Sequence, residues 1–186
     1  MRKIIVSNMV TLDGYIAGPN GEIDWFVVND EFFKYNNAVQ SNVDTILFGR
    51  VTFQGMESYW TTPAAMETDP VMTDYMNKTP KVVFSKTQQK VDWSNSTLIK
   101  GNLAEEVTKL KQHPGKDIII YGSGTIVSAL TPLSLIDDYV LFITPVVLGC
   151  GKPLFEGINT PVNLKLTETK TFANGLVVLR YQPAAK

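Results

Sequence analysis

The sequence predicts an α/β fold of three layers, α/β/α, with a central, mainly parallel sheet and a C-terminal antiparallel hairpin. Short runs of β-branched and aromatic residues alternate with segments of helical periodicity, which is typical of this class. The Asn174-Gly175 pair lies between the last two strand-like segments and is a strong signal for a hairpin turn. No repeat, low-complexity tract or linker divides residues 1–186, so we expect a single domain.

The predicted parallel strands are continuously apolar, as expected of strands that are covered on both faces. They are Ile4–Ser7, Thr45–Phe48, Val82–Phe84 and Ile118–Tyr121. Three further strand-like segments follow, Tyr139–Val147, Val162–Phe172 and Leu176–Tyr181. The first of these contains five consecutive apolar residues, 139–143, which are too hydrophobic for an uncovered sheet edge. We therefore predict that this stretch takes part in self-association.

Helical periodicity is clearest between Asn102 and His113. Asn102 and Glu105 have the spacing of a capping box, and Pro114-Gly115 ends the helix. The buried stripe comprises Leu103, Val107 and Leu110. An earlier helix, capped by Asn29 or Asp30, is predicted to bury Phe32, Tyr35, Val39 and Val43, and a short helix covers Thr125–Leu130. The stretch 61–78, with Tyr75 and Met76, is predicted to be a lid or a surface loop.

The composition is that of a soluble globular protein, with 44% hydrophobic and 19% charged residues. A formal net charge of −1 offers no basic surface for nucleic acid. Asn8, Thr11 and Asp13 interrupt the first apolar run, so we expect neither a signal peptide nor a membrane span, and a cytoplasmic location. The single Cys150 fits a reducing compartment, and we assign it a packing role. No cluster of histidine, cysteine and carboxylate residues has ligand spacing, so no metal site is expected.

Three turns share one design and point to a phosphate-bearing ligand. Each follows an apolar strand: Gly49-Arg50-Val51-Thr52, Ser85-Lys86-Thr87 and Gly122-Ser123-Gly124-Thr125. Such turns meet at the carboxyl ends of the strands, where open α/β sheets bind ligands. A helix that starts there offers free N–H groups, and Arg50 and Lys86 add positive charge. The alternative is that these glycines serve only tight turns. Val127 stands where the common dinucleotide fingerprint has its third glycine, so that fingerprint is absent.

With these turns in place, the chain resembles the dihydrofolate reductase-like superfamily, which includes the reductase domain of the bifunctional riboflavin-biosynthesis deaminase–reductase. The matching segments run in order through nearly the whole chain: Ser7–Ala17, Asp24-Trp25, Leu47–Phe53, Val83–Lys86, Ile120–Gly124, Ile136–Tyr139 and Pro145–Phe155. The resemblance implies NADPH lying across the sheet, with its nicotinamide near Ala17 and Gly18. The residues that it places on the cofactor are Ala17, Gly18, Gly49, Arg50, Val51, Thr52, Ser85, Lys86, Gly122, Ser123, Gly124, Thr125, Ile126 and Val127.

The resemblance is weaker on the substrate side. Asp30 matches the acidic residue that anchors the pterin ring in dihydrofolate reductases, and the alternative is that it caps the following helix. Trp25, Tyr59 and Trp60 are candidate substrate contacts; core or dimer contact is the alternative for the last two. The segment 78–81 lacks the arginine that holds the folate tail, and 55–60 replaces the segment that seats the ribose phosphate.

The predicted function is an NADPH-dependent reductase of a small nitrogen heterocycle. By resemblance, its substrate is 5-amino-6-(5-phosphoribosylamino)uracil of riboflavin biosynthesis. Dihydrofolate is the alternative substrate, and a non-catalytic nucleotide-binding protein is the alternative class. The resemblance also implies a two-fold homodimer. The net charge and the interrupted apolar run predict that it binds neither nucleic acid nor membrane.

Overall fold

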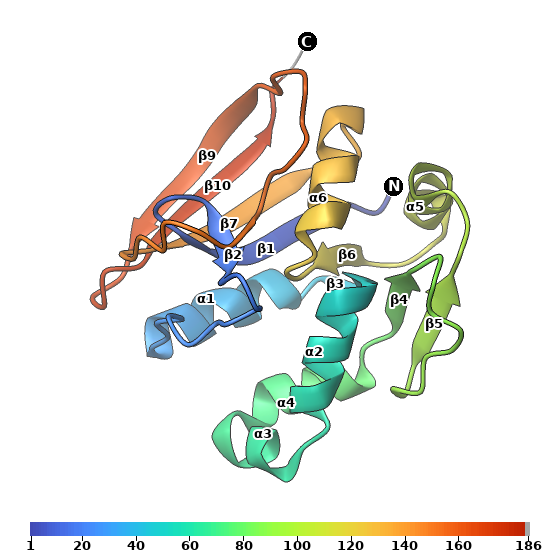
Figure 1. The fold of residues 1–186 in the computed structure, drawn as a ribbon, viewed down its shortest axis with the longest axis horizontal. Helices are drawn as coiled ribbons and strands as arrows, with labels where there is room; N and C mark the ends of the chain where they lie inside the picture. Colours follow the sequence, from blue (N-terminus) through green and yellow to red (C-terminus); the bar gives the residue numbers. More distant parts are fainter. Residues whose placement is uncertain (185–186) are drawn as a thin grey trace.

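The computed structural model describes residues 1–184, which form one eight-stranded sheet, a two-stranded ribbon and seven helices (Figure 1). The strands are β1 (Ile4–Thr11), β2 (Tyr15–Ala17), β3 (Val43–Gly49), β4 (Lys81–Phe84), β5 (Ser96–Ile99), β6 (Asp117–Ile120), β7 (Asp138–Thr144), β8 (Lys152–Pro153), β9 (Leu164–Thr171) and β10 (Val177–Pro183). The helices are α1 (Asp30–Gln40), α2 (Arg50–Trp60), α3 (Pro63–Thr68), α4 (Pro70–Lys78), α5 (Leu103–Gln112), α6 (Gly124–Leu130) and the 3-10 helix η1 (Thr131–Leu133).

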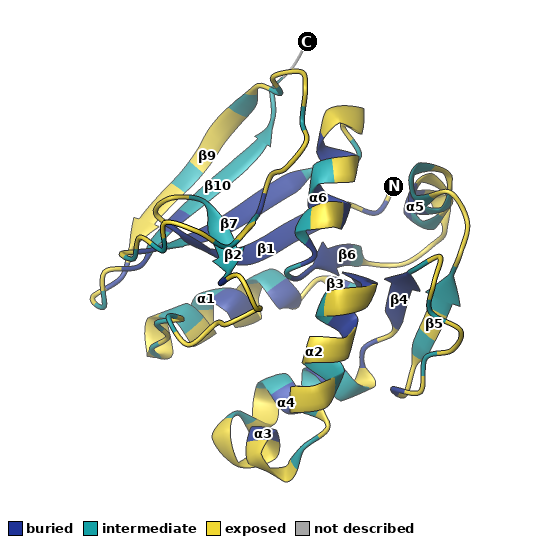
Figure 2. Cartoon of the chain, in the orientation of Figure 1, coloured by how far each residue is buried: buried dark blue, intermediate teal, exposed yellow. Residues whose placement is uncertain are grey.

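The large sheet has the strand order β5-β4-β3-β6-β1-β7-β10-β9. The first six strands run parallel to their neighbours, whereas β10 is antiparallel to both β7 and β9. The central strands are almost fully buried, as the dark blue colour of β1, β3, β6 and β7 shows (Figure 2). The predicted parallel core and C-terminal hairpin are therefore confirmed.

The two faces of the sheet carry separate hydrophobic clusters. On one face, Phe48, Phe142 and Val178 pack against α1, α2 and α4. On the other face, Leu47 and Tyr139 pack against α5 and α6. Alternate residues of one strand thus serve opposite faces, and a three-layer α/β/α architecture results.

Two predicted helix starts are confirmed by their caps. The side chain of Asn29 accepts a hydrogen bond from Phe32 N, so Asn29 and not Asp30 caps α1. The side chain of Asn102 accepts from Glu105 N at the start of α5. The placement of Val43 on the first helix was wrong, because α1 ends at Gln40 and Val43 begins β3.

The prediction of a lid or surface loop over 61–78 was wrong. The stretch forms α3 and α4, each of which begins with a capping side chain followed by proline, at Thr62-Pro63 and Asp69-Pro70. Met76 is fully buried and Tyr75 packs on the same cluster. These two residues therefore anchor α4 to the sheet.

A buried lysine caps carbonyl groups at the carboxyl end of α4. The Lys81 ammonium donates to the carbonyl oxygens of Met76 at 2.7 Å and Thr79 at 2.8 Å, and it lies 4.5 Å from the centre of the Trp93 ring. The side chain is only 1% exposed, and this burial lowers the pKa of Lys81 to about 8.

The C-terminal hairpin turns at Asn174-Gly175, where Gly175 has a φ of +88°. β7 lies inside the sheet between β1 and β10, so the residues 139–143 are not at an edge. The argument that these residues would leave an uncovered apolar edge is therefore wrong. The homodimer itself stays a prediction. Among residues 1–184, no helix has the length and apolar character needed to cross a membrane.

Candidate cofactor and substrate site

The three turns predicted to bind phosphate lie together at one edge of the sheet. β4, β3, β6 and β1 are consecutive parallel neighbours, so their carboxyl ends point the same way (Figure 1). β4 ends at Phe84, before Ser85-Lys86; β3 ends at Gly49; and β6 ends at Ile120, before Gly122. Helices α2 and α6 begin at this edge, where their first N–H groups have no partner within the helix.

Two of these turns are locked together by hydrogen bonds. Gly49 N donates to Ser123 Oγ at 3.0 Å, and Ser123 N donates to Thr52 Oγ1 at 2.9 Å. Ser123 is buried and adopts the left-handed conformation, with a φ of +53°. Its hydroxyl therefore joins the starts of α2 and α6.

A third strand is tied to the same turn by Asn8, which lies in β1. Gly122 N donates to Asn8 Oδ1 at 2.5 Å, and Asn8 Nδ2 donates to Gly122 O at 3.0 Å. Asn8 was not identified as a site residue from the sequence. A signal was present, because Ser7-Asn8 interrupts an otherwise apolar strand with a polar pair that needs buried partners.

The glycines of the second turn allow close approach between parts of the chain itself. A Cβ at Gly122 would lie 2.8 Å from Thr52 Cγ2, and one at Gly124 would lie 2.7 Å from the carbonyl oxygen of Pro153. Both distances are too short for a real contact. The glycine pattern therefore serves turn packing, which was the structural alternative, and the case for a ligand depends on the surrounding geometry.

The segment predicted to meet the nicotinamide lies beside the start of α6. Ala17 ends β2, which pairs with β8, and Gly18 N donates to Glu22 O at 2.8 Å. Asp13, just before β2, binds the loop that leads into β8. Its carboxylate accepts hydrogen bonds from the backbone N–H groups of Leu148 and Gly149 in that loop. The hydrogen bond from the Thr11 hydroxyl lowers the pKa of Asp13 below its ordinary value.

Arg50 is connected to the Ser85 turn through two glutamines. Arg50 Nη1 donates to Gln54 Oε1 at 3.3 Å, and Gln54 Nε2 donates to Gln88 Oε1 at 3.0 Å. Gln88 N in turn donates to Ser85 Oγ at 2.9 Å. The structure thus places Arg50 and Ser85 on neighbouring turns of one polar network.

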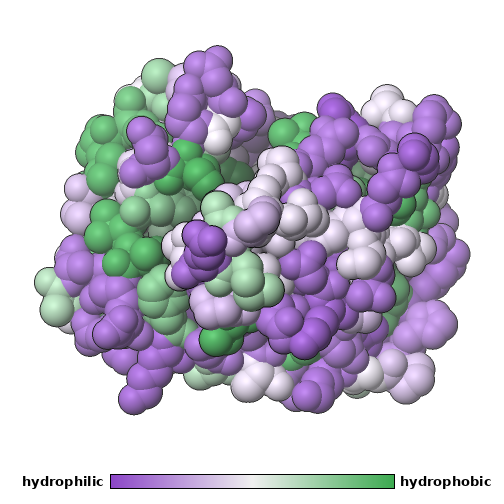
Figure 3. All heavy atoms as spheres, turned by 90° about the horizontal axis from the view of Figure 1, so that it is seen from below, coloured by the Kyte–Doolittle hydropathy of each residue, from purple (hydrophilic) through white to green (hydrophobic). Residues whose placement is uncertain are grey.

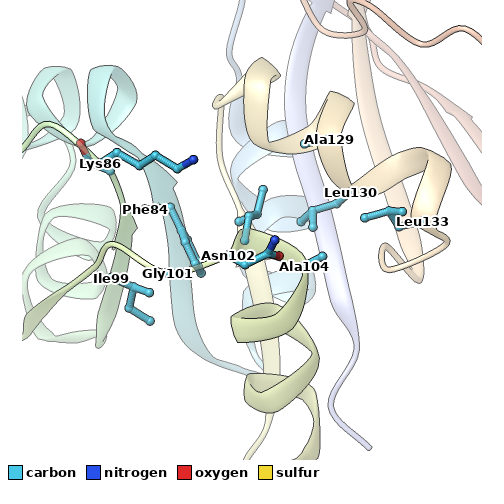
Figure 4. Close-up of a pocket in the computed structure, with 11 residues that line it drawn as sticks. Phe84, Lys86, Ile99, Gly101, Asn102, Ala104, Ala129, Leu130 and Leu133 are labelled. Carbon is cyan, nitrogen blue, oxygen red and sulfur yellow. The ribbon is translucent and has the colours of Figure 1, made fainter.

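Next to this network is a cavity of about 450 Å³ (Figure 4). One wall is formed by the ends of β4 and β5, and the other by α6 and η1, with the start of α5 between them. Its lining is mostly apolar, and the Lys86 side chain reaches from the β4 side toward α6. The lining residues are Phe84, Ser85, Lys86, Ile99, Gly101, Asn102, Leu103, Ala104, Ala129, Leu130 and Leu133.

The predicted substrate residues are more dispersed. Trp25 is partly buried and donates from Nε1 to Glu22 O, and Asp30 is exposed in the first turn of α1. Tyr59 and Trp60 end α2, roughly 15 Å along the helix from Arg50. Trp60 packs on the core cluster, whereas Tyr59 is 44% exposed. Trp25 also packs on that cluster, so the structure places Trp25 and Trp60 on the same face of the sheet, while Tyr59 and Trp60 lie at the far end of α2.

Cys150 lies in the loop between β7 and β8, and its thiol is free and exposed. The packing role assigned to it was therefore wrong. Its neighbours in the chain are glycines, which provide no apolar pocket for the sulfur.

Comparison with known proteins shows the family to which the chain belongs. The model of the RibD C-terminal domain matches residues 2–178. YyaP, an uncharacterized protein of Bacillus subtilis (strain 168), is 40% identical over 182 residues, which cover 97% of this chain and 94% of YyaP.

Several solved structures share the fold at low identity. A protein assigned to riboflavin biosynthesis from Shewanella sp. PV-4 has a TM-score of 0.78 at 23% identity, with 98% of this chain and 99% of that chain covered. A diaminohydroxyphosphoribosylaminopyrimidine deaminase/5-amino-6-(5-phosphoribosylamino)uracil reductase from Thermotoga maritima has a TM-score of 0.71 at 15% identity, with 98% and 57% covered. Dihydrofolate reductase from Enterococcus faecalis, complexed with NADP(H), has a TM-score of 0.66 at 17% identity, with 98% and 97% covered. The predicted fold type is confirmed.

Proposed function

Because the chain belongs to the RibD C-terminal domain family, we propose that it is a reductase that uses NADPH to reduce a small nitrogen heterocycle. The family and its reductase-like structural neighbours support the reductase role. The choice of NADPH and of a heterocyclic substrate is our proposal, and it depends on the edge of the sheet described above.

The observation that carries the proposal is the combination of the locked turns with the cavity beside them. The mostly apolar walls of the cavity suit an adenine ring, and Ser85 and Lys86 place a hydroxyl and a cation at its rim. Arg50, one strand away, adds a guanidinium that can bond two phosphate oxygens at once. These residues fit the phosphorylated adenosine end of NADPH.

The sheet also provides the length that a dinucleotide needs. From β4 to β1 there are three strand spacings, which amount to about 14 Å. A cofactor lying across these strands would run from the cavity, past the starts of α2 and α6, to Ala17 and Gly18. The bound cofactor supplies hydride at its nicotinamide ring, and the protein's task is to position the two rings face to face.

Asp30 is the residue that we assign to the substrate. Because Asn29 caps α1, the Asp30 carboxylate is not needed for that purpose and remains available in the first turn of the helix. A carboxylate in that place can accept a ring N–H and fix the orientation of a heterocycle.

We also propose a two-fold homodimer formed through the C-terminal strands. Leu166 on the outer strand β9 is 48% exposed, and Leu164 and Tyr181 are only partly covered by the cluster that they contact. A second copy can cover this surface. Light scattering that gives a monomer mass at micromolar concentration would contradict the dimer.

The experiment that tests the reductase proposal has two steps. The first is a titration of the purified protein with NADPH, followed by fluorescence. The second is a screen of nitrogen heterocycles, including the aminouracil ribose phosphate and dihydrofolate, by loss of NADPH absorbance. Binding with turnover of at least one compound is expected. Absence of NADPH binding contradicts the proposal, whereas tight binding without turnover of any compound favours the non-catalytic alternative.

A further inference from the structure

The chain has three arginines, and none of them belongs to the loop 18–29 or to α1. Arg2 is buried at the amino-terminal edge of the sheet, where it pairs with Asp44. Arg180 on β10 lies next to Tyr35 of α1, but its guanidinium is already paired with Asp138, at 2.6 Å between Nη2 and Oδ2. Arg50 starts α2 on the cofactor side. Guanidinium is the side chain that grips phosphate and carboxylate best, because it bonds two oxygens at once. No such group is available for an anionic substrate.

The loop and helix on the substrate side are instead acidic. The loop 18–29 and α1 contain four carboxylates and one lysine, although the whole chain has 17 basic and 18 acidic residues. The carboxylates belong to Glu22, Asp24, Asp30 and Glu31, and the lysine is Lys34. Lys152 on β8 lies near Glu22, and its charge is partly balanced there. Excess negative charge at the mouth of a site disfavours phosphate and carboxylate ligands.

The same region exposes an unusual number of large apolar side chains. Four lie within eleven residues of sequence, on the loop before α1 and on its first turn: Ile23 (51% exposed), Phe26 (38%), Val28 (46%) and Phe33 (37%). Trp25 stands next to them, with its ring 4.7 Å from that of Phe26 in an edge-to-face arrangement. Figure 3 shows hydrophobic groups between hydrophilic ones on the left of the molecule, the side on which α1 and the turn between β9 and β10 lie in Figure 1. Exposed apolar groups gathered in this way are typical of a ligand-binding surface.

From these observations we infer that the substrate is a flat, uncharged heteroaromatic compound that has neither a phosphate nor a carboxylate group. The inference rests on the proposed reductase function and specifies the substrate class. The apolar groups and Trp25 supply contacts to the faces and edges of a ring, and Asp30 supplies one polar contact to a ring N–H. An anionic tail would meet carboxylates and no arginine. The phosphoribosyl aminouracil and dihydrofolate are thereby both disfavoured.

The test compares neutral and anionic ligands that share one ring. The protein is saturated with NADP⁺, so that no hydride is transferred, and binding is measured by ligand-observed NMR and calorimetry. The pairs are 7,8-dihydrobiopterin against 7,8-dihydrofolate, and 5,6-diaminouracil against its phosphoribosyl derivative. We expect the neutral member to bind at least about tenfold more tightly, which corresponds to one lost charge contact. An anionic member that binds as tightly as its partner overturns the inference, and so does the absence of binding by every compound. Failure of NADP⁺ or NADPH to bind instead overturns the reductase proposal.

Single substitutions, with one control, locate the binding surface. Phe26→Ser is expected to weaken the neutral ligand about tenfold and to leave NADPH affinity unchanged. The control is Val71→Ser, which removes a side chain that is 64% exposed on α4, away from this surface, and it should change neither. Val28→Arg adds the missing guanidinium and is expected to improve the anionic member of a pair. If anionic binding in the native protein is instead lost in Lys34→Ala or Lys152→Ala, these lysines hold the anion and the inference is wrong.

Discussion

The side chain of Asn8 and the backbone of Gly122 exchange two hydrogen bonds across the carboxyl ends of β1 and β6. The two residues are 114 positions apart in sequence, so this pair joins the N-terminal strand to the turn that starts α6. It holds in place the same turn that Ser123 locks to α2.

Asn8→Ala is expected to loosen this turn. The Gly122 N–H loses its acceptor, and the unfolding free energy should fall by about 1–2 kcal/mol. NADPH affinity should fall with it, because the start of α6 is no longer fixed. Denaturant unfolding and NADPH titration measure the two effects. An Asn8→Ala protein with native stability and native NADPH affinity would mean that the two hydrogen bonds to Gly122 are unimportant.

Cofactor preference is expected to depend on Arg50 and Lys86. NADPH differs from NADH by one phosphate, and a charge-assisted hydrogen bond to it contributes roughly 1.5–3 kcal/mol. Arg50→Ala should therefore weaken NADPH about ten- to a hundredfold and hardly affect NADH, with Lys86→Ala acting in the same direction. Titrations at fixed ionic strength measure both affinities. Lys90→Ala removes an exposed lysine that is paired with Asp92 and is the control. Equal losses for both cofactors would place Arg50 away from the adenosine phosphate.

Asp30→Asn is expected to lower the rate of reduction without lowering the stability of the protein. The variant loses the carboxylate that we assign to the substrate, so the reduction rate should fall at least about tenfold while NADPH binding and thermal stability stay unchanged. Asn29→Ala is the matched control, since it removes the cap of α1 and should cost about 1 kcal/mol of stability with little effect on rate. The opposite result, in which Asp30→Asn loses stability and keeps its rate, would remove Asp30 from the site.

The buried ammonium of Lys81 should make stability rise with pH above about 8. The pKa of Lys81 is lowered to about 8 in the folded protein, whereas the ordinary value is 10.5. Between these values the unfolded chain binds more protons, so the unfolding free energy increases with pH, by up to about 1.4 kcal/mol per unit. Below pH 8 the lysine is charged in both states and this dependence disappears. Denaturant unfolding at intervals from pH 7 to about 9.5 measures the slope.

Lys81→Met is the comparison for this measurement, and its slope should be smaller than that of the native protein over the same interval. The upper limit of the interval avoids tyrosine ionisation. Burial raises the pKa of Tyr35 and Tyr75 to about 12, which makes stability fall again at pH values above their ordinary 10. A native protein whose stability is flat from pH 8 to 9.5 would show that Lys81 stays charged.

The sequence predicted those parts of the fold and of the site that depend on residues close to one another in the chain. Continuous apolar runs predicted β1, β3, β4 and β6, and parallel strands with turns at one edge necessarily bring Gly49, Ser85 and Gly122 together. Asn102 was identified because a cap bonds a residue three positions away. The starts of α3 and α4 contradict the prediction of a loop over 61–78, although the sequence holds a signal for them. At Thr62-Pro63 and Asp69-Pro70 a proline follows a capping residue, which is typical of a helix start.

Other features depend on partners that are distant in sequence and could not be predicted from it. β2 exists because Tyr15 and Ala17 pair with residues 152–153. The role of Ser123 depends on Gly49 N, 74 positions away. Neither Ser123 nor Asn8 carries a local pattern that specifies its partner.

The position of β10 has a consequence for synthesis on the ribosome. β10 covers the edge of β7, yet residues 145–176 separate the two strands in the chain. While these residues are being translated, β1 and β7 are complete and the backbone N–H and C=O groups along the Val140-Leu141-Phe142 edge are open. An uncovered apolar edge of this kind pairs readily with other chains. Polypeptides released by premature stop codons before Val177 should therefore aggregate, and a chaperone that shields this edge during translation should raise the yield of the native protein.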